Sequence, residues 1–545
     1  MAVKGLGGFH LAADAENDGT VKRLRRRKLR EEKPFALMSF DLEKIARYAR
    51  VQSEEERLLS SPQRPIVLLK KKHPHPLSDA VSPGNCYFGT MLPYTPLHYL
   101  LLSHDFTALV MTSGNRSDEP ICTDEQEAFR RLSGIADYFL VHNRDIFVRA
   151  DDSIVRAVAG ETRMIRRSRG YAPVPLFLRE NVPPVLACGA ELKNTICLTR
   201  ENQAFLSQHI GDLENLATYD FFVQTIEHLE NVLRIRPQVV AYDRHPDYLS
   251  TRYARERAGV EKVAVQHHHA HIAGCMAEHR IEGPVMGLAF DGTGWGPDGT
   301  IWGGEILIAD QARFRRVASL SPLPMPGGAA AVREPWRMAV SCLYDAFGEG
   351  LQNLDLPWLN EVGVKKVGLL VTMIQKGINA PMTSSLGRLF DGVAAILGLR
   401  RQVSFEGQAA MDLEMLAGEA GEAHYDDQWE EGEVIRVLPV PIIEGVVRDL
   451  RRGKPRAEIS RKFHKTLIVL FARLCAAIKK TEGLNRVCLS GGVFQNRILL
   501  CGLTEALEAR GFEVFSHRLV PTNDGGISLG QALIAAATLK KSSKT

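Results

Sequence analysis

The sequence predicts an α/β protein built from a smaller N-terminal unit and a bilobal C-terminal unit. Short apolar runs that alternate with helical patterns extend through most of the 545 residues, as in α/β domains. Prolines 173, 175, 183 and 184 are typical of a linker and place a boundary near residue 180. Beyond it, strand, hairpin and helix patterns occur twice in succession, which predicts two lobes. We therefore expect domains at 1–180 and 181–545.

Composition limits the class of protein. Hydrophobic residues make up 45% and charged residues 24% of the chain, which is typical of globular domains and excludes a disordered or collagen-like chain. A net charge of +4 does not favour nucleic acid as a partner. No apolar run approaches the ~18 residues of a membrane span. The nine cysteines form no C-x-x-C pair, which indicates reduced thiols. We expect a cytoplasmic protein with no membrane partner.

The N-terminal unit begins with a strand that runs into a glycine turn at residues 2–11, so we expect the chain to be part of a longer protein. Residues 20–33 follow and include eight Lys or Arg, with Leu24 and Leu29 placed to face a core. Such a run is either a solvated helix face or a polyphosphate or nucleic-acid surface. The strands expected later in this unit are one that begins at Leu109 and ends in a Ser/Gly/Asn turn, and the pair 154–158 and 162–166.

The C-terminal unit is predicted from alternating elements of both kinds. The expected helices are 218–234, 247–258 and 268–280, with mostly helical structure over 320–480. The expected strands are 185–188, 195–199, 203–206, 285–290, 301–309, 487–489 and 512–516.

A cluster of histidines, Gln266-His-His-His-Ala-His271, begins the third of these helices. His267 and His271 lie one turn apart on one helix face, a spacing that suits a divalent metal, and His268 with His271 is the competing pair. Two imidazoles need a carboxylate in addition, for which Asp524 in its glycine turn is the best candidate. This donor set suits Zn²⁺ or Fe²⁺. The alternative is a polar helix start whose histidines only form hydrogen bonds.

Two glycine turns predict a nucleotide cleft beside the histidines. Asp291-Gly-Thr-Gly294 lies between two strands, and Ser490-Gly-Gly492 lies between a strand and a helix. Glycine lets backbone N–H groups approach phosphate closely. Asp291 would orient a metal or a nucleophile, and Lys193 would supply a positive charge.

A second polar set lies in the N-terminal unit, where Lys28 and Arg30 can neutralise polyphosphate while Ser113 and Asn115 orient sugar or phosphate oxygens. This pattern predicts a site for a nucleotide or for RNA. The sequence carries no nucleophile elbow and no P-loop.

These motifs resemble known families. Lys28-x-Arg30 with Lys33-Pro34, followed by Ser113-x-Asn115, looks like the YrdC-type domain, an ATP-dependent carbamoyl-adenylate former. The second unit resembles the carbamoyltransferase branch of the actin-like (ASKHA) superfamily. The motifs that carry this second resemblance are Gln266–His271, Asp291–Gly294, Ser384–Gly387, Phe405–Gln408, Ser490–Asn496 and Asn523–Gly526.

In this order and in one chain, the two domains resemble the HypF family, the carbamoyltransferases of nickel–iron hydrogenase maturation. Members of that family begin with an acylphosphatase domain and a paired zinc-finger domain, which have no counterpart here, in agreement with the expected longer protein.

The resemblance implies a reaction and its participants. Carbamate, derived from carbamoyl phosphate, would react with ATP and Mg²⁺ to give carbamoyl-AMP and pyrophosphate. The carbamoyl group would then pass to the C-terminal cysteine of the partner protein HypE. It also implies catalytic roles for Lys28, Arg30, Lys193 and Asp291, and metal ligation by His267, His271 and Asp524. The implied nucleotide contacts are Lys28, Arg30, Ser113, Asn115, Arg166, Lys193, Gly292, Gly491, Gly492 and Asn496.

Three other functions remain open at the level of sequence. Transfer-RNA threonylcarbamoylation uses the same two domain types as separate proteins and would require threonine. A double-stranded RNA surface on residues 22–33 would show a steep dependence on salt. An ADP-forming sugar kinase of the actin-like class would leave the histidine cluster without a role.

Overall fold

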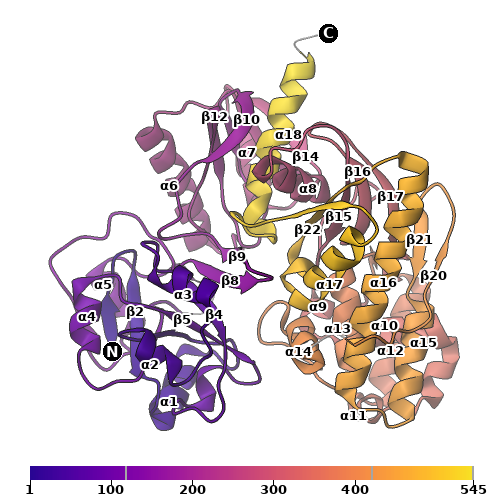
Figure 1. The fold of residues 1–545 in the computed structure, drawn as a ribbon, viewed down its shortest axis with the longest axis horizontal. Coiled ribbons are helices and arrows are strands. Elements are labelled where there is room, and N and C mark those ends of the chain that lie inside the picture. Colours follow the sequence, from indigo (N-terminus) through magenta and orange to yellow (C-terminus); the bar gives the residue numbers. More distant parts are fainter. Residues whose placement is uncertain (117–118, 419–420, 543–545) are drawn as a thin grey trace. The chain divides into compact units, whose positions relative to one another are not determined.

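The computed structural model describes residues 1–116, 119–418 and 421–542, so the predicted domain 181–545 extends three residues past the described part. The chain forms two compact units, one built mainly from residues 1–242 and the other mainly from residues 263–517. Each unit contains sheets flanked by helices, which confirms the predicted α/β class (Figure 1). The domain boundary near residue 180 stays a prediction.

A nine-stranded mixed sheet forms the N-terminal part of the first unit, in the order β7-β1-β2-β6-β3-β5-β4-β8-β9. Antiparallel pairing of β2 with β6 sets His10 opposite Ser113, so the two side chains share one face of the sheet. The strands are β1 (Ala2–Lys4), β2 (Phe9–Asp14), β3 (Ala36–Met38), β4 (Ile66–Lys70), β5 (Tyr87–Met91), β6 (Leu109–Ser113), β7 (Phe139–Leu140), β8 (Ile154–Val158) and β9 (Glu161–Arg166). The helices are α1 (Asp18–Lys28), α2 (Leu42–Ala46), α3 (Ser53–Ser60), α4 (Pro96–Leu102) and α5 (Glu125–Leu132).

Helix α1 carries the basic segment. Asn17 caps it by accepting a hydrogen bond from the Thr20 amide, and Leu24 packs into the core as predicted. The prediction that Leu29 also faces the core was wrong, because the helix ends at Lys28. Leu29 has a left-handed φ of 52°, and its side chain is 82% exposed. Lys28 is buried instead, so the segment is not simply a solvated face.

A five-stranded sheet follows in the chain, in the order β10-β12-β11-β13-β14. Two strands were predicted at 195–199 and 203–206, and the range Cys197–Leu206 overlaps both, because the chain reverses at Glu201, which has a φ of 54°, and the Ser207 amide donates to the Ile196 carbonyl at 2.9 Å. The strands are β10 (Leu176–Val182), β11 (Val185–Ala187), β12 (Cys197–Leu206), β13 (Val239–Asp243) and β14 (Glu261–Val265). The helices are α6 (Leu216–Leu233) and α7 (Leu249–Glu256), as predicted.

The second unit is built on a seven-stranded sheet, in the order β20-β21-β17-β16-β15-β22-β23. An antiparallel meander of β15, β16 and β17 continues through β22 and β23, which run parallel to β15. Its strands are β15 (Val285–Phe290), β16 (Gly304–Ala309), β17 (Phe314–Leu320), β20 (Gln428–Glu430), β21 (Ile435–Leu438), β22 (Arg486–Ser490) and β23 (Glu513–Ser516). A small separate sheet pairs β18 (Leu323–Pro324) with β19 (Met382–Thr383).

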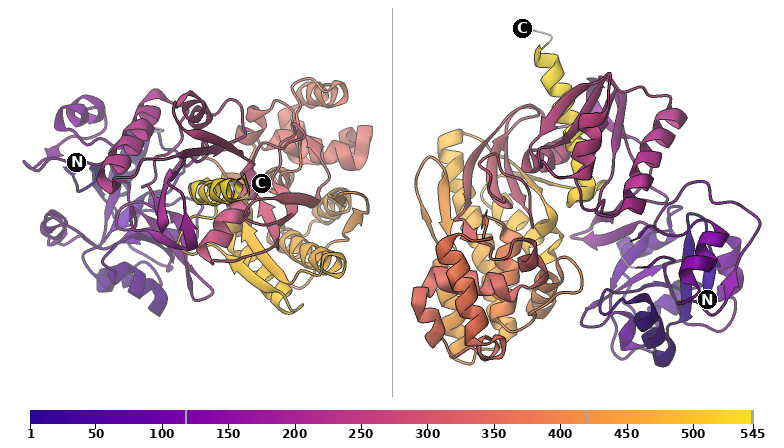
Figure 2. Two further views of the ribbon diagram at one scale, coloured as in Figure 1. Left: turned by 90° about the horizontal axis from the view of Figure 1, so that it is seen from above. Right: turned by 180° about the vertical axis from the view of Figure 1, so that it is seen from behind.

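Helices surround this sheet, and α10 packs against α12, α13 and α15 to form the helical layer that Figure 2 shows in two further views. The prediction of mostly helical structure over 320–480 is confirmed except at the four short strands β18 to β21. The helices are α8 (His267–Glu278), α9 (Ala329–Arg333), α10 (Trp336–Phe347), α11 (Pro357–Val362), α12 (Val364–Lys376), α13 (Leu386–Ile396), α14 (Gln408–Ala417), α15 (Val440–Arg451), α16 (Arg456–Glu482), α17 (Arg497–Glu508) and α18 (Ile527–Ser542).

Candidate functional site

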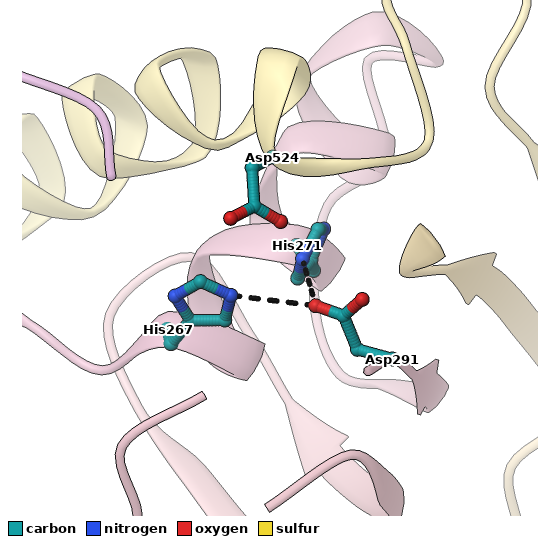
Figure 3. A group of neighbouring side chains, drawn as sticks. All are labelled: His267, His271, Asp291 and Asp524. Atoms are coloured by element: carbon teal, nitrogen blue, oxygen red, sulfur yellow. Dashed lines mark hydrogen bonds and ion pairs between the residues drawn. The ribbon is translucent and has the colours of Figure 1, made fainter. Parts of the chain in front are cut away.

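Four side chains gather around the first turn of α8. His267 and His271 lie one helical turn apart on α8, and Asp291 follows the last residue of β15. Asp524 lies in a short 3₁₀ turn, Asp524–Gly526, that Asn523 caps. One ligand atom from each of the four residues lies within 4.8 Å of the others, and all four residues are buried (Figure 3). We call these four residues the His–Asp cluster.

The carboxylate of Asp291 is held from both sides. Its Oδ1 accepts hydrogen bonds from the amides of Gly292, at 2.8 Å, and Gly492, at 3.1 Å. Its Oδ2 lies 3.1 Å from His271 Nε2 and 3.4 Å from His267 Nε2. Burial alone would raise the pKa of Asp291, but the two histidines hold this pKa well below its usual range. The Asp291 carboxylate is therefore ionised and held in a fixed position.

Contacts at the ring nitrogen that faces away from the His–Asp cluster orient the imidazoles. His267 Nδ1 lies 2.8 Å from Asp243 Oδ2, and both side chains are fully buried. A carboxylate at Nδ1 favours a proton there, which would leave the Nε2 lone pair available to a metal ion in the cluster. Burial lowers the pKa of His271, which favours the neutral form that metals require.

The competing pair of His268 and His271 does not form, because, in the part of the chain that the structure describes, His268 is not among the residues whose ligand atoms meet within 4.8 Å. His268 Nδ1 lies 3.2 Å from the Gln266 side chain, and its Nε2 lies 4.0 Å from Glu305. The predicted i, i+4 pair is thus the one that the structure brings together. Two imidazole nitrogens and two carboxylates fit Zn²⁺ or Fe²⁺, and their chemistry does not distinguish the two ions.

The second predicted site is centred on Lys28, which is 3% exposed. Its Nζ donates to the carbonyls of Ser113 and Asn115, both at 2.7 Å, and to Asn115 Oδ1 at 2.6 Å. Ser113 Oγ also donates to Asn115 Oδ1, at 2.8 Å. Three of the four residues predicted here therefore form one bonded group at the end of β6.

Positive charge accumulates around this group. Burial, with the positive charge of Arg30 next in size, lowers the pKa of Lys28 to about 7. Burial, followed by the charges of Arg25 and Arg166, lowers the pKa of Arg30 to about 9. Arg30 also donates to Thr112 Oγ1, at 3.2 Å, and to the Lys33 carbonyl, at 3.1 Å. A polyanion bound among these cations would restore their usual pKa values, because it supplies the missing negative charge.

The other residues predicted to contact the nucleotide form contacts within the protein. The Gly292 and Gly492 amides hold Asp291, as described above. Asn496 caps α17 through its Oδ1, and its Nδ2 lies 2.9 Å from His464 Nε2. Gly491 has a φ of 108°, and a Cβ there would lie 2.2 Å from the Phe290 carbonyl, so no other residue fits. Lys193 lies in a turn, and the backbone N–H of Lys193 donates to Asp212 Oδ1, at 2.7 Å. Their nucleotide roles stay predictions.

Sequence reasoning missed Asp243, and it gave Asp291 an orienting or catalytic role without placing it among the four residues of the His–Asp cluster. Both aspartates end or directly follow a buried strand, β13 and β15 respectively, and this repeated position was the signal available in the sequence. In the described residues, no helix has the length and apolar character needed to cross a bilayer.

Models of known families match most of the chain. Residues 180–278 match the model described as the HypF Kae1-like domain, and residues 287–531 match the second subdomain of the Kae1-like carbamoyltransferase domain. Residues 1–168 match a model of the Sua5, YciO and YrdC proteins, described as telomere recombination.

Curated relatives match over nearly the full chain. It is 43% identical to carbamoyltransferase HypF2 of Cupriavidus necator, over 98% of this chain and 71% of that protein. It is 44% identical to carbamoyltransferase HypF of Rhizobium leguminosarum, over 98% of this chain and 70% of that protein. The fold and these relatives define the chain as a carbamoyltransferase.

Solved structures agree with this class. A crystal structure of full-length HypF in a phosphate- and nucleotide-bound form superposes with a TM-score of 0.95 at 46% identity, covering 99% of this chain and 84% of that one. The structure of HypF from T. kodakarensis gives a TM-score of 0.93 at 36% identity, covering 99% and 72%. The chain belongs to the HypF family.

Proposed function

We propose that this carbamoyltransferase uses ATP to form carbamoyl-AMP and transfers the carbamoyl group to the C-terminal cysteine of HypE. This reaction would supply the cyanide ligands of nickel–iron hydrogenase, in the cytoplasm. The observation that carries the proposal is the pairing, in one HypF-family chain, of a buried cationic group at Lys28 with the His–Asp cluster. The first suits a polyphosphate, and the second suits a metal ion.

The first half-reaction joins carbamate to ATP. A carbamate oxygen attacks the α-phosphorus of MgATP, the bond to the β-phosphate bridging oxygen breaks, and pyrophosphate leaves. Lys28 and Arg30, with Arg166 beside them, neutralise the charge that develops on the phosphates. Ser113 and Asn115 fix the ammonium of Lys28 through the bonds described above and orient the nucleotide.

The second half-reaction transfers the carbamoyl group. The HypE thiolate attacks the carbonyl carbon, the carbon–oxygen bond to AMP breaks, and AMP leaves as the phosphate anion. His267, His271, Asp291 and Asp524 would hold a Zn²⁺ or Fe²⁺ ion, which supplies Lewis acidity at the carbonyl or phosphate oxygen. Asp243 keeps the His267 Nε2 lone pair directed at the ion. Lys193, Gly292, Gly491, Gly492 and Asn496 would line the nucleotide.

Product analysis by mass spectrometry tests the proposal. The protein, loaded with Zn²⁺ or Fe²⁺, is incubated with MgATP, carbamate and HypE, with and without threonine. We expect AMP, pyrophosphate and HypE carbamoylated at its C-terminal cysteine, all independent of threonine. A HypE variant that lacks this cysteine is the matched control and should stay unmodified. A strict requirement for threonine would assign the chain to transfer-RNA modification, and ADP as the product would indicate a kinase.

A further inference from the structure

A line of buried polar side chains leads from His271 away from the His–Asp cluster. His271 Nδ1 lies 3.4 Å from Ser490 Oγ, and this Oγ lies 2.8 Å from His517 Nε2. His517 Nδ1 in turn lies 3.1 Å from Glu278 Oε2. The line thus joins three different elements, since His271 and Glu278 belong to α8, Ser490 ends β22 and His517 follows β23.

Burial makes these contacts obligatory. Ser490 is fully buried, His517 is 4% exposed, and the Glu278 side chain is 2% exposed. Buried polar atoms bond within the protein, because water cannot replace a missing partner. A buried carboxylate also needs a donor to offset the cost of leaving water. Glu278 finds this donor in His517, so the far end of the line is a buried, hydrogen-bonded carboxyl group.

The proton positions along the line follow from the two ends. When His271 Nε2 coordinates an ion, its Nδ1 carries the hydrogen and donates to Ser490 Oγ. The Ser490 hydroxyl then donates its own hydrogen to His517 Nε2. His517 consequently carries its proton on Nδ1 and donates to the Glu278 carboxylate. Every donor has an acceptor in this one direction, which runs from the cluster to Glu278.

We propose that Ser490, His517 and Glu278 are positioning residues that set the tautomer and ring orientation of His271 for metal binding. The two histidine ligands would thus reach their carboxylates differently, His267 by direct contact with Asp243 and His271 through a serine and a second histidine. Such outer partners fix ligand geometry and commonly contribute 10–100-fold to metal affinity. This inference rests on the metal site of the proposed function.

Metal titration of the full chain tests the inference. The metal-free protein is titrated with Zn²⁺ against a competing chelator, and its Co²⁺ form is examined by visible absorption, which reports ligand geometry. We expect Ser490→Ala and His517→Gln to weaken Zn²⁺ binding by about 10–100-fold and to shift the Co²⁺ bands. Glu278→Gln keeps the side-chain shape and one acceptor oxygen but removes the carboxyl group. The Zn²⁺ affinity of this variant should therefore fall between the affinities of the wild type and Ser490→Ala.

Ser460→Ala is the matched control. Ser460 is also fully buried and its hydroxyl donates to the Leu413 carbonyl, outside the line, so Zn²⁺ affinity and Co²⁺ bands should be unchanged. Wild-type affinity and bands in Ser490→Ala and His517→Gln would overturn the inference while leaving the metal site in place. Undiminished metal binding in the double variant His267→Ala, His271→Ala would instead overturn the proposed metal site itself.

Discussion

Replacement of Lys28 by methionine should remove a proton that the protein takes up when it binds ATP. The Lys28 ammonium is buried beside Arg30, and burial with this neighbouring charge lowers its pKa from 10.5 to about 7. The Lys28 side chain is therefore protonated, and so charged, in only part of the molecules near neutral pH. The polyphosphate of ATP would restore the charged form, because an anion beside an ammonium raises the pKa of the ammonium.

The size of the effect follows from this pKa. With a pKa of about 7, about half of the Lys28 side chains are charged at pH 7 and about one in ten at pH 8. ATP binding should then take up about 0.5 proton at pH 7 and about 0.9 proton at pH 8. Between pH 6 and pH 8 the loss of charged Lys28 should weaken ATP binding about tenfold, or about 1.4 kcal/mol.

Isothermal titration calorimetry with MgATP measures this uptake, since the observed heat varies with the ionisation enthalpy of the buffer. The difference between wild type and Lys28→Met removes the contribution of the nucleotide itself. Lys22→Met is the matched control, because Lys22 lies on the same helix but its side chain is 63% exposed. Equal proton uptake by the wild type and Lys28→Met at pH 8 would refute the reasoning.

Three further predictions concern the second unit. The double variant His267→Ala, His271→Ala should lose bound metal and carbamoyl transfer but keep carbamate-dependent pyrophosphate release. Metal analysis and a pyrophosphate assay measure these outcomes, and loss of both activities would contradict the assignment of the two half-reactions to separate sites. Asp243→Asn should weaken Zn²⁺ binding by about 10–100-fold, because an amide no longer fixes the His267 tautomer, and unchanged chelator competition would argue against that role. Gly530→Ala should lower the free energy of unfolding by about 1–3 kcal/mol in urea, since its Cβ would lie 1.8 Å from the Ala270 carbonyl. Gly368→Ala, with open space at its Cβ, is the control and should stabilise by up to about 1 kcal/mol; equal effects of the two would show that close packing of α18 on α8 is unimportant.

The sequence predicted features that depend on local periodicity. The i, i+4 placement of His267 and His271 requires only that the predicted helix of residues 268–280 include His267, and α8 begins at His267. The predicted bounds of β15 agree with the structure, because a short apolar run that ends at a glycine turn is a local pattern. Asp524 was correctly grouped with these histidines, from its glycine turn and the need for a carboxylate.

Features that depend on distant contacts could not be predicted. Asp243 approaches His267 across 24 residues, and Ser490 approaches His271 across 219 residues. The burial of Lys28 was equally hidden, because a basic helix normally faces water. It becomes evident only from the backbone oxygens of Ser113 and Asn115, 85 and 87 residues away, which accept its hydrogen bonds.

The central claim is that a carbamate oxygen attacks ATP and is left behind on AMP when the carbamoyl group moves to HypE. Carbamate labelled with ¹⁸O in both oxygens, supplied with MgATP and HypE in ordinary water, tests this claim by mass spectrometry of the released nucleotide. The account predicts AMP that carries one ¹⁸O atom, unlabelled pyrophosphate and one ¹⁸O atom in carbamoylated HypE. Unlabelled AMP alongside carbamoylated HypE, or ADP in place of AMP, would contradict it.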